Sequence, residues 1–121
     1  MAGKSVAQEA AVLNTLDGTE KLGFYTAAPT DSTPGTEVSG GSYAPQLIAW
    51  GAVSGGSPSQ RANSGQITFP VATADWGTLV AWAVKDGSTG AIKYWGTMTP
   101  LAVATGNQVV VPVGALVVTE N

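Results

Sequence analysis

The sequence of 121 residues contains no cysteine and no histidine. Without cysteine it can form neither a disulfide nor a thiolate metal site. Without histidine it has no imidazole ligand for a metal and no Ser-His or Cys-His pair to activate a nucleophile. The glycine-rich residues 35–42 also lack the GK[ST] ending of a phosphate-binding loop. We therefore expect no catalytic, cofactor-binding or metal-binding residue, and interpret the chain as a binding or structural protein rather than an enzyme.

Charged residues are scarce as well. They make up 11% of the chain, less than half of the roughly 25% that is usual for globular proteins. The net charge is −3 and the five basic residues are scattered, which argues against a nucleic-acid partner because phosphate binding needs clustered Lys and Arg. A surface with few charges is easily desolvated. We expect this chain to pack against other protein chains, including copies of itself, with a trimer as one expected form.

Long apolar runs are missing too. None approaches the roughly 20 residues of a membrane span, so no membrane partner is expected. The first ten residues, MAGKSVAQEA, lack the apolar core of a signal peptide. We therefore expect the protein in the cytoplasm in which it is made.

One short segment has helical spacing, residues 5–16. Ser5 and Gln8 fit a capping box. Three apolar residues then fall on one face, Val6, Ala10 and Leu13. Such a short helix with a thin stripe is marginal alone and must dock on the sheet or on a neighbouring subunit. We expect residues 1–20 to be an assembly contact, with Val6 and Leu13 among the contact residues.

Residues 21–121 are expected to form one all-β domain. Apolar residues alternate with polar ones in about seven short segments, separated by turns rich in Gly, Pro, Asp and Asn, and this spacing predicts an antiparallel β-sandwich or a jelly-roll-like barrel. The sequence DGSTG predicts a hairpin at residues 86–90. Residues 43–50 are apolar on both faces, which predicts that neither face is solvated. The expected strands are residues 21–26, 43–50, 66–69, 78–85, 91–98, 108–111 and 115–119.

A pair of carboxylates is the enzymatic arrangement that the composition still permits. A glycosidase needs two of them at a defined separation across a sugar cleft, and the candidates are Glu37 with either Asp31 or Asp75. Asp75 lies in a turn before Trp76, where Asp commonly binds backbone N–H groups. We therefore interpret these carboxylates as structural.

The aromatic residues are the main candidates for contacts. Trp and Tyr bury a large area while keeping one polar group, which suits protein interfaces. Packing in the core and a platform for a sugar are the alternatives for each of them. We expect Trp76 to pack under one end of the sandwich. The expected interface residues are Tyr43, Trp50, Trp82 and Trp95, together with Val6 and Leu13.

Three stretches carry a resemblance to a known family. They are ITFPVATADWGTLVAWAV at residues 67–84, GTEVSGGSYA at residues 35–44 and GALVVT at residues 114–119. In this order they resemble a family of small tailed-phage virion proteins, whose members are labelled tail-fibre-like or minor structural proteins. The resemblance covers most of the chain from Leu22 onward, and it implies a structural protein of the virion.

Two positions in a virion fit this resemblance. The first is a capsid decoration protein that docks on the major capsid protein and stabilises the lattice. A chain of 121 residues without repeats or heptads has no shaft of its own, which favours this interpretation. The alternative is a tail-fibre or tail-tip module that binds a receptor or glycan on the host surface. The copy number per particle separates the two.

Overall fold

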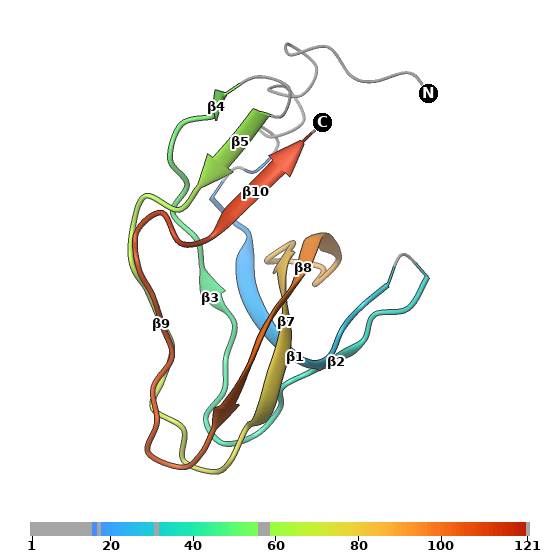
Figure 1. Ribbon diagram of the computed structural model, residues 1–121, viewed down its shortest axis with the longest axis vertical. Coiled ribbons are helices and arrows are strands. Elements are labelled where there is room, and N and C mark those ends of the chain that lie inside the picture. Colours follow the sequence, from blue (N-terminus) through green and yellow to red (C-terminus); the bar gives the residue numbers. More distant parts are fainter. Residues whose placement is uncertain (1–15, 17, 31, 56–58, 121) are drawn as a thin grey trace.

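The structure is a computed structural model that describes residues 16, 18–30, 32–55 and 59–120. This part of the chain contains ten β-strands and no helix (Figure 1). Five of the strands have only two residues, so the count exceeds the seven expected. The strands are β1 (Lys21–Ala27), β2 (Thr36–Glu37), β3 (Gln46–Leu47), β4 (Ser54–Gly55), β5 (Ser59–Ala62), β6 (Ile67–Thr68), β7 (Gly77–Lys85), β8 (Ile92–Val103), β9 (Val110–Val111) and β10 (Val117–Glu120).

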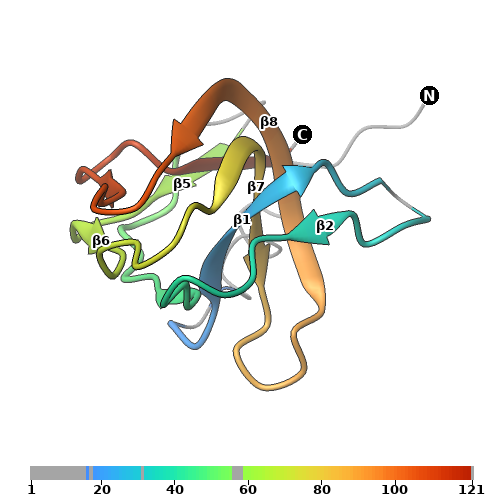
Figure 2. The ribbon, with the colours of Figure 1, turned by 90° about the horizontal axis from the view of Figure 1, so that it is seen from below.

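The strands form three antiparallel sheets. The largest has the order β2-β1-β7-β8, with β3 also paired to β1. The smaller sheets have the orders β10-β5-β4 and β6-β9. Figures 1 and 2 show β5, β6 and β9 on one side of the long strands β1, β7 and β8. The predicted all-β antiparallel architecture is therefore confirmed.

The hydrophobic core lies between the large sheet and the smaller ones. Leu22 and Phe24 of β1 alternate with residues of the opposite face and point into it. Ile67 and Phe69 enter from the other side and are almost fully buried. Apolar residues from both layers thus interdigitate in one core, which is the arrangement of a β-sandwich.

Three expectations about the strands were wrong. The barrel alternative fails because, in the described part of the chain, no strand pairs with the outer edge of β2 or of β8. The strand expected at residues 43–50 shrinks to β3, and its Leu47 is 62% exposed, so one face is solvated. The strand expected at residues 91–98 continues to Val103. Pro100 fits within it because the register shifts there, and a bulge tolerates a residue that lacks an N–H donor.

The helix expected at residues 5–16 lies outside the described residues, apart from Leu16. Leu16 belongs to the hydrophobic core and is 1% exposed. Its carbonyl oxygen accepts a hydrogen bond of 2.6 Å from the Arg61 guanidinium on β5. The chain that leads into β1 is therefore anchored to the smaller sheets before the first strand begins.

Asn63 is a buried polar residue that joins two parts of the smaller layer. Its Nδ2 donates to the carbonyl oxygens of Gly65 and Pro112, at 2.8 and 3.0 Å, and its Oδ1 accepts from the Leu116 N–H at 3.0 Å. Its backbone N–H also donates to the Leu116 carbonyl oxygen. The Asn63 side-chain amide therefore forms hydrogen bonds with backbone groups of the turn before β10. The two-residue strand β9 ends before this turn and cannot pair with them.

Replacement of Asn63 should be costly, because it leaves these buried backbone groups without partners. We expect Asn63→Ala to lower the free energy of unfolding by about 3 kcal/mol. Chemical denaturation followed by Trp fluorescence measures this value. Asn107→Ala is the matched control: Asn107 is exposed, so we expect a loss below about 0.5 kcal/mol. Equal losses in the two variants would contradict the role given to Asn63.

Trp76 packs under one end of the sandwich, as predicted, and is 5% exposed. Its Nε1 donates to the Gly41 carbonyl oxygen at 2.9 Å, and its ring meets the edge of Tyr43 at a centroid distance of 5.2 Å. We expect Trp76→Ala to cost about 3–5 kcal/mol of stability. Trp95→Ala should cost about 1 kcal/mol or less, because Trp95 is 38% exposed. A Trp76 loss as small as that of Trp95, measured in the same denaturation series, would refute this packing.

Candidate functional site

The predicted contact residues fall into three groups. Val6 and Leu13 lie outside the described residues. Tyr43 and Trp50 are half-buried and are engaged by internal contacts. Trp82 packs against the core, whereas Trp95 is 38% exposed on β8. Their role as interface residues stays a prediction, and Trp95 is the most available of the four aromatic residues.

Tyr43 closes a gap in the large sheet. Between β2 and β3, the edge of β1 has no strand beside it at Phe24. The Tyr43 hydroxyl accepts a hydrogen bond from the Phe24 N–H at 2.9 Å and donates one to Glu37 Oε2 at 2.6 Å. Burial and the bond to Glu37 raise the pKa of Tyr43 above its usual range. Tyr43 therefore acts as a neutral structural link in the sheet.

Glu37 is held between Tyr43 and a cation. Its second oxygen forms an ion pair with the Lys85 ammonium on β7. The carboxylate lies over Gly23, where a Cβ would be 2.5 Å from Glu37 Oε2, so a larger residue there would displace the carboxylate from this position. Both oxygens of this candidate catalytic residue are thus occupied by internal partners.

The other candidate carboxylates give no clear catalytic pair. Asp75 Oδ1 accepts hydrogen bonds from the N–H and the hydroxyl of Thr105, at 2.9 and 3.1 Å. It therefore ties the turn before β7 to the turn after β8. Asp31 lies outside the described residues. In the part of the chain that the structure describes, no group of three or more Asp and Glu side chains could hold a metal ion.

Sequence reasoning missed a buried ion pair at the start of β1. Glu20 is 0% exposed, and its carboxylate accepts from Lys93 Nζ at 2.7 Å, from Trp50 Nε1 at 3.1 Å and from the Gly18 N–H at 3.1 Å. The Arg61 guanidinium lies 5.8 Å from the centre of the Trp50 ring. A register shift between β7 and β8 places Lys93 where it reaches Glu20. No local pattern in the sequence indicates a contact over such a separation.

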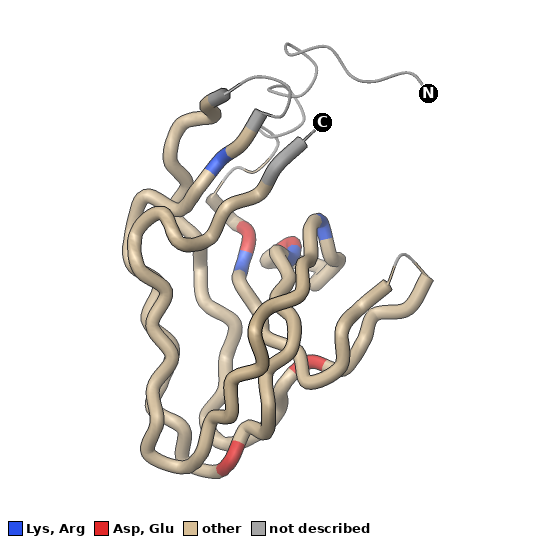
Figure 3. Tube along the Cα trace, viewed as in Figure 1, with Lys and Arg blue, Asp and Glu red and all other residues tan. Residues whose placement is uncertain are grey.

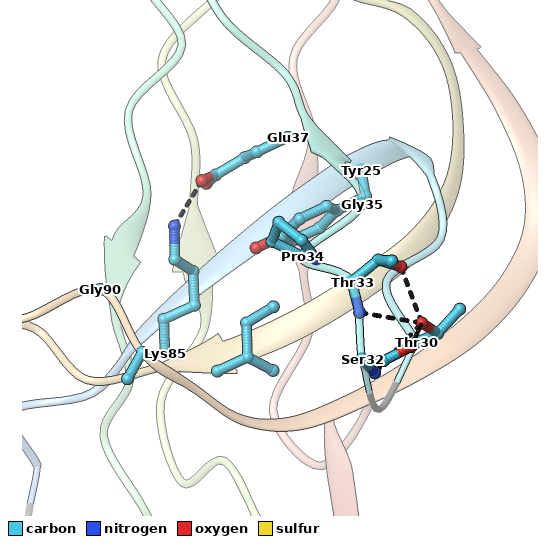
Figure 4. A pocket seen from close by; sticks show the side chains of 11 residues that line it. Tyr25, Thr30, Ser32, Thr33, Pro34, Gly35, Glu37, Lys85 and Gly90 are labelled. Carbon is cyan, nitrogen blue, oxygen red and sulfur yellow. Dashed lines mark hydrogen bonds and ion pairs between the residues drawn. The ribbon is translucent and has the colours of Figure 1, made fainter.

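A polar cleft lies between the loop that joins β1 to β2 and the turn that joins β7 to β8. Its volume is about 470 Å³. Figure 4 shows Lys85 and Glu37 facing one another at one side, and the hydroxyls of the β1–β2 loop gathered at the other. We call it the polar cleft, and its lining residues are Tyr25, Thr30, Ser32, Thr33, Pro34, Gly35, Glu37, Lys85, Gly90, Ala91 and Ile92.

The β1–β2 wall of the polar cleft is braced by its own hydrogen bonds. The Thr30 hydroxyl accepts from the N–H groups of Ser32 and Thr33, at 3.3 and 3.0 Å, and lies 2.7 Å from the Thr33 hydroxyl. Gly35 has a φ of 67°, and a Cβ there would lie 2.5 Å from the Ala27 carbonyl oxygen. Glycine at this position therefore lets the loop close tightly on its base.

The opposite wall is braced by Asp86. Its Oδ1 accepts hydrogen bonds from the N–H groups of Ser88 and Thr89, at 2.8 and 2.9 Å. These bonds, the one from Thr89 first, lower the pKa of Asp86. The predicted hairpin between β7 and β8 is confirmed, and it forms a fixed wall. At the floor, burial raises the pKa of Tyr25, against the opposing effect of the Lys85 ammonium.

An apolar groove of about 440 Å³ opens beside the edge of β8. Leu22, Phe24 and Trp82 belong to both the groove and the core. Along the rim, Leu101 and Val110 are 45% and 42% exposed. We call it the apolar groove, and its lining residues are Leu22, Phe24, Trp82, Met98, Leu101, Val109, Val110, Val111, Pro112, Ala115, Leu116 and Val117.

No charged residue lines the apolar groove, and the sequence from Tyr94 to Thr119 contains none. Figure 3 shows the segment around β9 and the start of β10 without a charged position. Trp82 crosses toward β8 at Gly96, where a Cβ would lie 2.7 Å from Trp82 Cζ2, so the indole covers the glycine. The groove can thus exclude water without desolvating any ionised group.

The described residues include no helix with the length and apolarity needed to cross a membrane.

Comparison with known proteins matches the chain to a family model. Neither the curated proteins nor the solved structures contain a match to this chain. A family model described as Podophage GP4 fiber I protein gp80 matches residues 9–119. The match spans the polar cleft, the apolar groove and all three stretches on which the resemblance to tailed-phage virion proteins rested. The chain therefore belongs to the family of the podophage GP4 fiber I protein gp80, and it is a structural protein of a phage virion.

Proposed function

We propose that this protein is a module of a tail fibre, that it joins the virion through protein contacts, and that it binds without catalysing a reaction. The observation that carries the proposal is the match of residues 9–119 to a family named for a fiber protein. That name favours the tail-fibre interpretation over capsid decoration.

The proposed contacts use the apolar groove. Three of its rim residues are among the large hydrophobic side chains that remain exposed, Leu101, Val110 and Val117. Contiguous apolar surface of this kind commonly marks a protein interface. We propose a second copy of this chain as the occupant, because the rim offers no charge for a charged partner and a two-fold contact would cover the same apolar patch on both copies.

Absence of catalysis is proposed from the state of the carboxylates. Glu37 is shared between Tyr43 and Lys85, and Asp75 is bound by Thr105. A general acid or nucleophile needs a carboxylate that can approach a substrate. These two are held instead by contacts that brace the sheet and its turns.

Copy number tests the position in the particle. We expect a handful of copies per virion at the tail, since a fibre module follows the symmetry of the tail. Quantitative mass spectrometry of purified particles gives the number, and a cryo-EM reconstruction gives the place. On the order of hundreds of copies on the capsid shell would refute the fibre position and restore capsid decoration.

A matched pair of leucines tests the apolar groove. Leu101 is 45% exposed on the rim, and Leu47 is 62% exposed outside the groove. We expect Leu101→Glu to abolish self-association, because a buried carboxylate without a partner is strongly unfavourable. Leu47→Glu should leave it intact.

Sedimentation over a range of protein concentrations measures this association. We expect it to depend weakly on salt, because apolar burial does not respond to ionic screening. A monomeric wild-type protein, or equal behaviour of the two variants, would rule out the groove as the self-contact.

A further inference from the structure

Each wall of the polar cleft has hydrogen bonds of its own among the described residues. The β1–β2 loop is braced by the Thr30 hydroxyl, and the β7–β8 turn is braced by the Asp86 carboxylate. Gly35 and Gly90 both adopt positive φ, at 67° and 75°, one in each wall. A ligand that enters such a cleft orders little of the protein, so less of the interaction free energy is lost to conformational entropy.

The charges of the described residues that line the polar cleft cancel. Lys85 and Glu37 form an ion pair, and they are the only charged side chains among its described lining residues. An anionic ligand that approached Lys85 would meet the Glu37 carboxylate, and a cationic ligand would meet the Lys85 ammonium. The cleft therefore favours a ligand without net charge that can both donate and accept hydrogen bonds.

Four of the other nine lining residues carry a hydroxyl group. Ser32 and Thr33 are exposed, and each hydroxyl can serve as donor and as acceptor. Lys85 carries three N–H donors, so the ion pair with Glu37 does not exhaust its ammonium. Ile92 and Pro34 add apolar surface to this polar set. Figure 4 shows Pro34 between the loop hydroxyls and the Lys85–Glu37 pair.

We propose that the polar cleft binds one residue of a neutral glycan. A sugar ring has hydroxyls that donate and accept, C–H faces that pack on Pro34 and Ile92, and no charge that would disturb the ion pair. The cleft, at about 470 Å³, lies within the roughly 300–1,000 Å³ of typical ligand sites. This inference rests on the proposed function, because a fibre module is the virion part that would bring the cleft to a cell surface.

Nuclear magnetic resonance tests the inference on the purified full-length protein. The probes are glucose, galactose, mannose, rhamnose, N-acetylglucosamine and N-acetylgalactosamine, each added to on the order of tens of millimolar because single-residue binding is weak. N-acetylneuraminic acid is the charged probe. We expect at least one neutral sugar to shift the backbone amide signals of Ser32, Thr33 and Ile92, with the remaining signals unmoved.

Two blocking variants and one control locate the effect. Ser32→Trp fills the cleft from the β1–β2 wall, and Ala91→Trp fills it from the opposite wall. Both side chains are exposed, so at least one variant should keep the wild-type spectrum elsewhere. Ser39→Trp adds the same indole at an exposed position outside the cleft. We expect the shifts to disappear in the folded blocking variants and to persist in Ser39→Trp.

Other results would overturn the inference. Absence of any shift with all the neutral sugars would do so, and so would shifts that survive in a folded blocking variant. Tighter binding of N-acetylneuraminic acid than of every neutral sugar would refute the neutral class. These outcomes are independent of the position in the particle: sugar binding by a protein found on the capsid would refute the fibre position alone.

Discussion

The Glu37 carboxylate occupies a break in the large sheet, and several parts of the molecule depend on how it is held. On the side of β1 away from β7, no strand lies beside Phe24, and the Tyr43 hydroxyl accepts a hydrogen bond from the Phe24 N–H there. Glu37 fixes that hydroxyl, and Lys85 on β7 fixes Glu37. Because the Tyr43 ring also packs on Phe69, this one contact links the edge of the sheet, the core and the polar cleft. Loss of the carboxylate would leave the Tyr43 hydroxyl without its acceptor. The Phe24 N–H would then lose the group that holds its own acceptor in place.

The same sheet carries two surfaces of opposite character. The polar cleft lies on the face turned away from the main core, where Tyr25 of β1, Lys85 of β7 and Ile92 of β8 contribute to its lining. At the β8 edge, the smaller layer does not close over the core, so Leu22, Phe24 and Trp82 form the floor of the apolar groove. A closed barrel would have no such edge. The open sandwich therefore provides separate places for a small polar ligand and for another protein chain.

Much of the fold could be predicted from the sequence, because its determinants are local. Alternation placed Leu22 and Phe24 on the core face, and the sequence after Asp86 specified the hairpin. The rest depends on contacts between distant residues. Glu20 precedes a strand like any solvated charge, and its burial is made tolerable by partners distant in sequence, Lys93 at 73 positions and Trp50 at 30. Pro100 marks the end of a strand by local rules, yet a bulge lets β8 continue.

The aromatic residues illustrate why the candidate sites were harder to predict than the strands. A large ring with one polar group suits an interface, but it suits the junction of two sheets equally well. Tyr43 and Trp50 lie at such a junction. The Tyr43 hydroxyl donates to Glu37, and the Trp50 indole N–H donates to Glu20. The absence of charge from residues 94–119 is the better guide to the apolar groove, because a surface that must be desolvated excludes ionised groups whatever its shape. Such a surface can select its partner only by shape, whereas the polar cleft can select by hydrogen bonds. We therefore expect the two surfaces to tolerate different substitutions. Binding at the apolar groove should depend on the volume of its side chains, and binding at the polar cleft should depend on the identity of each polar group.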